Sequence, residues 1–170
     1  MDYELVSIDE ASFQITTNYK KIWFPRGEKP KRAFFWSNKK LIVFGALTST
    51  SKFYYEFHNS QNSFTFCCFL ENLFVRLDPN KKYVFILDNA GFHKTNLVKD
   101  VFEEQKRWIV VEHIPPYSPE LNPIETCWKV TKNAVMKSQY FKTIEAMQES
   151  LEIFWGKHIF TQKFMRYLCR

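Results

Sequence analysis

The run YVFILDN, residues 83–89, decides the fold. Five apolar or aromatic residues end directly at Asp88 and Asn89, and a short uninterrupted run of this kind predicts a strand covered on both faces. Such strands occur in mixed α/β sheets, where ligand sites form at the carboxyl ends of the strands. Asp88 therefore marks the edge of the sheet where chemistry is expected.

The apolar periodicity on either side of this run predicts further strands and helices. The expected strands are Leu5 toward Ile15, 41–47, 52–57 and a buried strand over 108–114, and the expected helices are 63–77, 95–105, 122–137, 143–155 and a helical tail over 159–168. This order predicts a mixed five-stranded α/β sheet flanked by helices. Its first three strands are antiparallel and its last two run parallel to the first.

Length and composition exclude several classes of protein. A chain of 170 residues with 45% hydrophobic and 18% aromatic residues predicts one folded domain and argues against disorder. The four cysteines show no metal-ligand or disulfide spacing, which indicates a reducing compartment. No apolar stretch is long enough to span a bilayer, and the acidic start is unlike a signal peptide. A cytoplasmic location without membrane contact is expected.

The formal net charge of +6 is unevenly distributed. Residues 19–40 hold eight Lys or Arg and one acid, and residues 126–170 hold eight bases and three acids, whereas residues 41–125 are slightly acidic. Two basic segments around an acidic middle suit a polyanion held around a site rich in carboxylates. The alternative is two solvated surfaces with no ligand.

Two of the three candidate acids lie on predicted strands. Asp88 either caps the turn after its strand or serves as a ligand. In the first strand, Asp9 and Glu10 must point to opposite faces of the sheet. Only one of them can share a site with Asp88, and the alternation alone does not decide which.

The third acid, Glu125, falls in the first turn of a predicted helix. Asn122, Pro123 and Glu125 fit a capping box, in which the glutamate bonds back to the cap. The same position, at the positive end of the helix dipole, also keeps a carboxylate ionised for a cation. Lys129 and Lys132 share the face of Glu125, where a phosphate backbone could lie.

Together the three acids suit a site for hard divalent cations. Carboxylate oxygens are the ligands such ions prefer, and a pair of ions can activate a water or hydroxyl and stabilise the leaving oxygen during phosphodiester cleavage. The sequence has no nucleophile elbow, Walker loop or dinucleotide fingerprint. A nucleophilic side chain is not needed for such chemistry.

Four stretches resemble a known family: SIDEASF (7–13), WFPRGEKP (23–30), VFILDNAGFHKT (84–95) and HIPPYSPELNPIETCWKVTKNAV (113–135). They are similar to the catalytic domain of DDE transposases of the mariner-like superfamily, particularly the prokaryotic insertion-sequence branch. The resemblance spans about residues 5–140 and implies a ribonuclease H-like fold. It also implies that Asp9, Asp88 and Glu125 are the catalytic, metal-binding acids.

By this resemblance, the chain is expected to hydrolyse a phosphodiester at each element end and to use the freed 3′ hydroxyl to attack target DNA, typically at TA. Two Mg²⁺ ions are the implied cofactors, with Mn²⁺ as a substitute. Asn89 and His93 match the DNA-x-x-H motif, and His93 either orients a ligand, contacts DNA or is a packed structural histidine. Pro115, Pro116 and Pro119 are expected to stiffen the loop before Glu125.

The remaining expectations concern DNA and chain organisation. Phosphate contacts are expected from Lys20, Lys21, Arg26, Lys29, Lys31, Arg32, Lys129 and Lys132. We expect a catalytic domain over 1–140, a helical extension packed on it over 141–170, and no amino-terminal helix-turn-helix domain. End recognition would then come from a separate helix-turn-helix chain, with a homodimer for paired ends and a nucleoid-associated location.

Two alternatives to a transposase remain open. One is a stand-alone ribonuclease H-like nuclease, which would cut but not join. The other is a non-catalytic DNA-binding or assembly remnant of a transposase.

Overall fold

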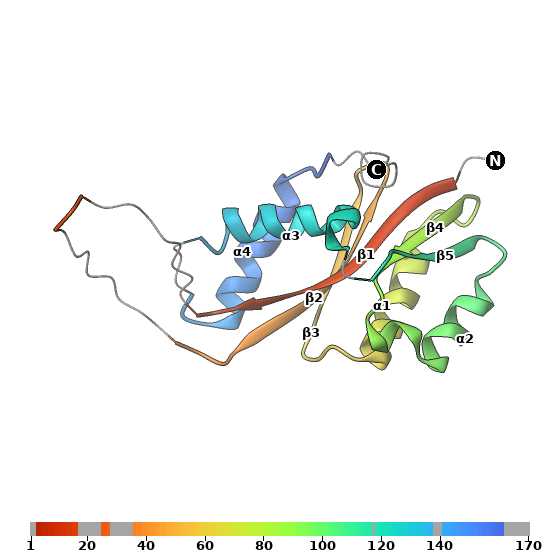
Figure 1. Cartoon of the computed structure of the whole chain (residues 1–170), viewed down its shortest axis with the longest axis horizontal. Helices are drawn as coiled ribbons and strands as arrows, with labels where there is room; N and C mark the ends of the chain where they lie inside the picture. Colours follow the sequence, from red (N-terminus) through yellow and green to blue (C-terminus); the bar gives the residue numbers. More distant parts are fainter. Residues whose placement is uncertain (1–2, 17–24, 28–35, 117, 138–140, 162–170) are drawn as a thin grey trace.

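In a computed structural model, which describes residues 3–16, 25–27, 36–116, 118–137 and 141–161, the chain forms a mixed five-stranded sheet (Figure 1). The strands are β1 (Tyr3–Gln14), β2 (Lys40–Thr48), β3 (Phe53–His58), β4 (Lys82–Leu87) and β5 (Ile109–His113). Their order is β3-β2-β1-β4-β5. The pairs β1–β2 and β2–β3 are antiparallel, and β1–β4 and β4–β5 are parallel. The predicted topology is confirmed.

The helices follow the predicted pattern closely. They are α1 (Ser63–Arg76), α2 (Asn96–Glu104), α3 (Pro123–Ala134) and α4 (Ile144–Lys157), with 3₁₀ turns η1 (Gly91–Lys94) and η2 (Pro119–Leu121). The two 3₁₀ turns were not predicted. They lie in the segments after β4 and β5, between a strand and the following helix, and both border the site described below.

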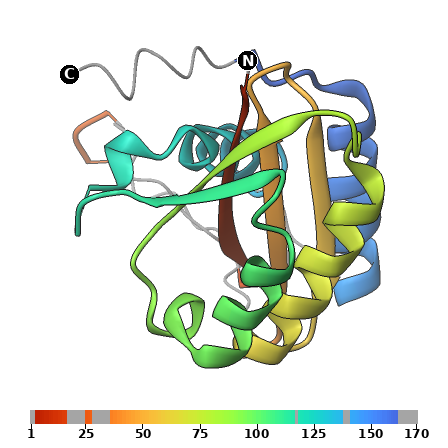
Figure 2. The ribbon, with the colours of Figure 1, turned by 90° about the vertical axis from the view of Figure 1, so that its right-hand side faces the viewer.

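Alternation along β1 separates two apolar cores. Ala11 and Phe13 contribute to a core with residues of α3 and α4, whereas Val6 and Ile8 belong to a core with residues of α1 and α2. Accordingly, α3 and α4 lie on one side of the sheet and α1 and α2 on the other (Figure 1). Figure 2 views the molecule from the side of α1 and α2.

The prediction that 108–114 is a buried strand is wrong in one respect. β5 pairs only with β4 and forms the edge of the sheet, so Ile109 is buried while Val110, Glu112 and His113 are exposed. Its apolar residues resemble those of a central strand, but a strand with one neighbour leaves part of its surface in water.

The predicted tail helix is also wrong where it can be assessed. The α4 helix ends at Lys157, and the chain from His158 to Thr161 has no helical structure, while residues 162–168 lie outside the described residues.

Met147, Leu151 and Trp155 of α4 share one apolar core with β1. None of the helices that the structure describes is long and apolar enough to cross a membrane.

Candidate active site

The sheet register brings Asp9 and Asp88 together. In the parallel ladder between β1 and β4, Ser7 pairs with Ile86, and two residues further along each chain are Asp9 and Asp88. Because side chains alternate, both acids project to the face of the sheet that α3 covers. The acid that shares a site with Asp88 is therefore Asp9, as the resemblance implied.

Glu125 reaches the same place from the first turn of α3. The capping-box interpretation is wrong, because the Asn122 side chain makes no cap hydrogen bond. Instead, Ser7 Oγ donates to Asn122 Oδ1 and accepts from the Ile124 amide at 3.2 Å. These two bonds fasten the start of α3 to β1. Within the described chain the Glu125 carboxylate makes no hydrogen bond, and its side chain is exposed.

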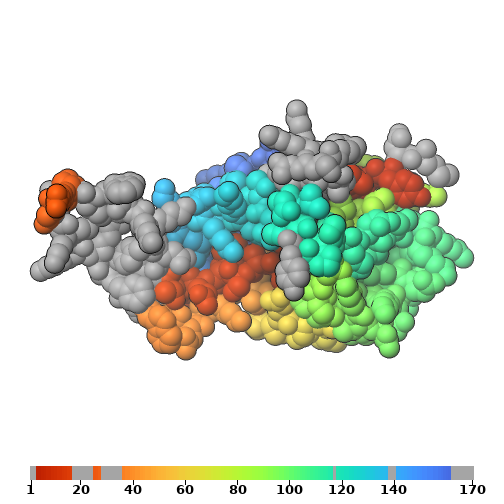
Figure 3. Space-filling view, viewed as in Figure 1, coloured from red at the N-terminus to blue at the C-terminus, as the bar shows by residue number. Residues whose placement is uncertain are grey.

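The three acids line one cavity of about 400 Å³. Asn89 and Asn122 add polar atoms to it, and most of the remaining wall comes from Ile114, Pro115, Pro116, Ser118 and Pro119. Figure 3 shows β1 (red), the segment after β4 (green) and the start of α3 (teal) meeting on one face. The proline-rich loop thus forms a wall of this cavity, next to Glu125.

The carboxylates repel one another. Burial raises the pKa of Asp9 well above its usual value, and the charges of Glu10, Glu125 and Asp88 raise it further. Partial loss of solvent around its carboxylate also raises the pKa of Glu125, although the residue as a whole is exposed; Lys132 opposes this shift, and Asp88 and Glu10 add to it. A divalent cation among these oxygens would relieve the repulsion.

The three carboxylates are therefore suitable ligands for hard divalent ions, although their side chains do not yet form a complete metal site. Among the described residues, no three His, Cys, Asp or Glu side chains lie close enough together to hold a metal ion. Asp9 is buried, with 7% of its surface exposed, whereas the Glu125 side chain is exposed.

Asp88 caps the turn after its strand, which is one of the two roles that the sequence left open. Its Oδ1 accepts from the Ala90 amide at 2.9 Å, which caps the turn, and lies 2.8 Å from His93 Nδ1. His93 is the main cause of the lowered pKa of Asp88. Within the part of the chain that the structure describes, Oδ2 of Asp88 has no hydrogen bond or ion pair, so one oxygen remains for a ligand.

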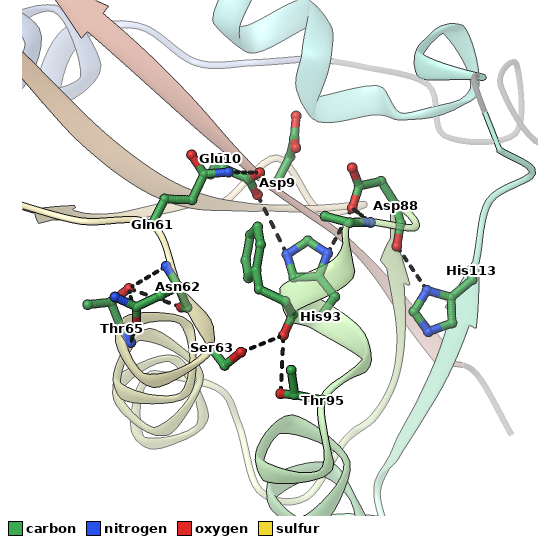
Figure 4. A network of polar contacts seen from close by, with 12 residues as sticks. Asp9, Glu10, Gln61, Asn62, Ser63, Thr65, Asp88, His93, Thr95 and His113 are labelled. Atoms are coloured by element: carbon green, nitrogen blue, oxygen red, sulfur yellow. Dashed lines mark hydrogen bonds and ion pairs between the residues drawn. The ribbon is translucent and has the colours of Figure 1, made fainter.

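His93 is buried between Asp88 and Glu10 and does not line the cavity of the three acids (Figure 4). Its Nε2 lies 3.6 Å from Glu10 Oε2, and the rings of Phe66 and Phe92 pack against it. Burial lowers the pKa of His93, but the carboxylates of Asp88 and Glu10 outweigh burial and raise it to about 9. His93 is thus both packed and in contact with a site acid.

Glu10 lies on the opposite face of β1 from Asp9, as alternation requires. Its Oε1 accepts from Gln61 Nε2 at 2.6 Å, and the other oxygen faces His93 (Figure 4). A chain of contacts therefore runs from Glu10 through His93 to Asp88, around the end of the sheet.

The ends of β4 and β5 are also linked beside the cavity. The Asn89 side chain donates to the Ile114 carbonyl, and the Ile114 amide donates to the Leu87 carbonyl at 2.9 Å. His113 Nδ1 lies 2.9 Å from the carbonyl oxygen of Asp88. Asn89 thus both lines the cavity and holds the start of the proline-rich loop.

A model of the DDE superfamily endonuclease family matches residues 4–148. The chain belongs to this family of DDE endonucleases. An insertion element IS630 protein of 39 kDa from Shigella sonnei is 28% identical over 159 residues, covering 88% of this chain and 46% of the relative. The Tc3 transposase of Caenorhabditis elegans is 25% identical over 180 residues, covering 91% and 54%. The chain spans about half the length of these curated relatives.

Solved structures of the Mos1 transposase share the fold. The Mos1 transposase paired-end complex with left transposon end matches with a TM-score of 0.78 at 22% identity, covering 97% of this chain and 51% of that one. Mos1 paired-end complexes with Mn and with Mg match with TM-scores of 0.74 and 0.73 at 20% identity, covering 97% of this chain and 52% and 53% of theirs. The fold is that of ribonuclease H-like transposase catalytic domains.

The basic residues predicted to hold DNA are only partly described in this member of the DDE endonuclease family. The positive charge of Lys132 partly offsets the upward shift in the pKa of Glu125. The Nζ atom of Lys132 lies 5.6 Å from the centre of the Phe13 ring. Lys129 is exposed on the same helix, and Arg26 is exposed in a turn. The other predicted residues, Lys20, Lys21, Lys29, Lys31 and Arg32, lie outside the described residues.

Sequence reasoning missed several residues that hold the site together. One is Trp128, whose Nε1 donates to Asp9 Oδ2 at 3.1 Å. Ser7 and His113 have no predicted role either, and Glu10 enters the sequence analysis only as the alternative to Asp9. Only Ser7 carried a signal, since it shares the face of Asp9 in the alternation of the first strand.

Proposed function

We propose that this chain is the catalytic part of a DDE transposase, which hydrolyses a phosphodiester at each element end and joins the freed 3′ hydroxyl to target DNA. The observation that carries the proposal is the convergence of Asp9, Asp88 and Glu125 on one cavity in a chain of the DDE family. The relatives named as transposases support the same activity.

The metal ligands in this proposal are Asp9, Asp88 and Glu125. When bound there, two Mg²⁺ ions, or Mn²⁺ in their place, supply Lewis-acid activation of a water or hydroxyl and stabilise the leaving oxygen. The Mos1 complexes with Mg and with Mn support this choice of metal.

The residues of the chain orient the ligands. Trp128 and the turn at Ala90 each hold one carboxylate oxygen, of Asp9 and Asp88 respectively. His93 holds Asp88 from the side away from the cavity. Pro115, Pro116, Ser118 and Pro119 line the cavity beside these ligands.

DNA is the proposed substrate and partner. Lys129 and Lys132 follow Glu125 along α3, where they can contact phosphates that flank the scissile bond. Residues 19–40 carry further positive charge in the sequence.

The finer parts of the proposal are cleavage at element ends, joining at TA, a homodimer, end recognition by a separate helix-turn-helix chain, and a nucleoid-associated location. The Mos1 paired-end complex supports the use of paired ends.

The test is incubation of the protein with precleaved element ends and a target plasmid in Mg²⁺. Joined product supports transposition, nicks without joining indicate a nuclease, and binding without either indicates a DNA-binding module. Asp88→Asn should abolish Mg²⁺-dependent product while the far-ultraviolet circular dichroism stays unchanged. Asp100→Asn, an exposed acid of α2, is the matched control and should retain activity. Undiminished cleavage by Asp88→Asn would remove Asp88 from the mechanism.

A further inference from the structure

A buried tryptophan of α3 contacts the most buried of the three acids. Trp128 Nε1 donates to Asp9 Oδ2 at 3.1 Å, and only 2% of Trp128 and 7% of Asp9 are exposed. The bond joins a helix to the central strand of the sheet, between residues far apart in the sequence. A buried indole N–H needs an acceptor, and here the acceptor is a proposed metal ligand.

A glycine in the neighbouring strand makes room for this tryptophan. Gly45 of β2 is the residue paired with Asp9 in the antiparallel ladder. A Cβ at Gly45 would lie 2.5 Å and 2.8 Å from two carbons of the Trp128 ring, and 3.2 Å from Ile124 Cδ1. Glycine inside a strand often marks such a close approach. The indole therefore lies directly over the backbone beside Asp9.

Other aromatic rings fix the orientation of the indole. Phe13, Phe53 and Trp155 meet Trp128 edge to face or nearly so, with ring centroids 6.3, 5.7 and 6.3 Å away. With its ring packed on several sides, Trp128 has little freedom to rotate, so its N–H stays directed at one carboxylate oxygen.

We propose that Trp128, seated over Gly45, is a positioning residue that holds the Asp9 carboxylate in the orientation needed to bind a divalent ion. The inference rests on the proposed function. A neutral N–H donor suits this role because it orients the carboxylate without adding a positive charge that would compete with the ion. Partners of this kind around a metal ligand strongly affect metal affinity.

Trp155 offers a matched control. It is also buried, and its Nε1 donates at 2.9 Å to Thr131 Oγ1, which is not a proposed ligand. Trp128→Phe and Trp155→Phe each remove one buried indole and one hydrogen bond. Mn²⁺ binding to the whole chain is then measured by electron paramagnetic resonance. We expect Trp128→Phe to weaken Mn²⁺ binding about 10- to 100-fold. Trp155→Phe keeps an aromatic ring beside Trp128 and removes no bond to a proposed ligand, so it should weaken Mn²⁺ binding far less.

A second pair of variants covers the case in which Trp128→Phe folds poorly. Gly45→Ala must displace the Trp128 ring and should weaken Mn²⁺ binding through the same contact. In Gly45→Ala/Trp128→Phe the smaller ring relieves the clash, so the losses should be far from additive. Additive losses would overturn the proposal, because they would mean that the two residues act independently.

A spectroscopic readout separates positioning from general packing. In the ¹⁵N-labelled wild-type chain, the indole N–H signal of Trp128 should shift as Mg²⁺ saturates the site, while that of Trp155 stays in place. Equal Mn²⁺ affinity of Trp128→Phe and the wild type would overturn this inference. So would an indole N–H signal of Trp128 that does not shift as Mg²⁺ is added. Neither result would overturn the proposed function. If the wild-type chain binds no Mn²⁺ at all, the metal centre of the proposed function fails with it.

Discussion

At the scale of single residues, Ser7 illustrates how one small side chain can place a helix. Its hydroxyl donates to Asn122 and accepts from the Ile124 amide, and both Ser7 and Asn122 are buried. Ser7→Ala leaves both partners unpaired in the interior. We expect the free energy of unfolding to fall by about 1–3 kcal/mol, as measured by urea denaturation.

Ser12, an exposed serine of the same strand, serves as the control for that experiment. Ser12→Ala should change the free energy of unfolding by less than about 0.5 kcal/mol. Equal effects of the two substitutions would mean that the Ser7 hydroxyl does not hold α3 to β1.

The adjacent acids of β1 show what could be predicted from sequence at this scale. Alternation establishes that Asp9 and Glu10 lie on opposite faces, but it treats the two faces alike. The packing of α3 on one face and of the α1 and η1 segments on the other gives Asp9 its tryptophan and Glu10 its histidine. Those contacts join distant parts of the chain, so no local pattern shows them.

At the scale of elements, α4 tests whether the residues after 140 form part of the catalytic core. Leu151 is fully buried in the core that β1, α3 and α4 share, and Leu151→Ala would leave a cavity there. We expect a loss of about 2–5 kcal/mol in one cooperative transition, seen equally by near- and far-ultraviolet circular dichroism. Separate transitions for α4 and the sheet would contradict a shared core.

Ile153, which is 52% exposed on the same helix, is the control for helix propensity. Ile153→Ala replaces a β-branched residue by a good helix former without opening a cavity. Its unfolding transition should therefore stay close to that of the wild type. A loss matching that of Leu151→Ala would show that burial is not the cause.

Element types were predictable because each has a local signal, and the failures occurred where the signal is not local. The apolar run before Asp88 gives β4 directly, since a buried strand is apolar throughout. The run in β5 looks similar, yet whether a strand has one neighbour or two depends on the sheet as a whole. Likewise, Asn122 and Glu125 fit a capping box by spacing, but Ser7 takes the asparagine side chain.

At the scale of the whole molecule, the charges around His93 predict how the metal-free protein depends on pH. Asp88 and Glu10 raise the pKa of His93 from 6.5 to about 9 in the folded state. Between these values the folded protein holds a proton that the unfolded chain has released, so stability falls as the pH rises. The raised pKa of Asp9 acts in the same direction from lower pH. The lowered pKa of Asp88 matters only below 3.8, where its contribution is lost as the pH falls.

In the presence of a chelator, the free energy of unfolding should therefore drop by about 3 kcal/mol between pH 6.5 and 9, at about 1.4 kcal/mol per unit of pKa shift. Urea denaturation at a series of pH values measures this slope. His93→Gln should flatten it, because the glutamine keeps a polar side chain but carries no titrating proton. His158→Gln, at the end of α4, should keep the wild-type slope. A steep slope that survives in His93→Gln would show that the contacts from Glu10 through His93 to Asp88 do not govern the pH dependence of the fold.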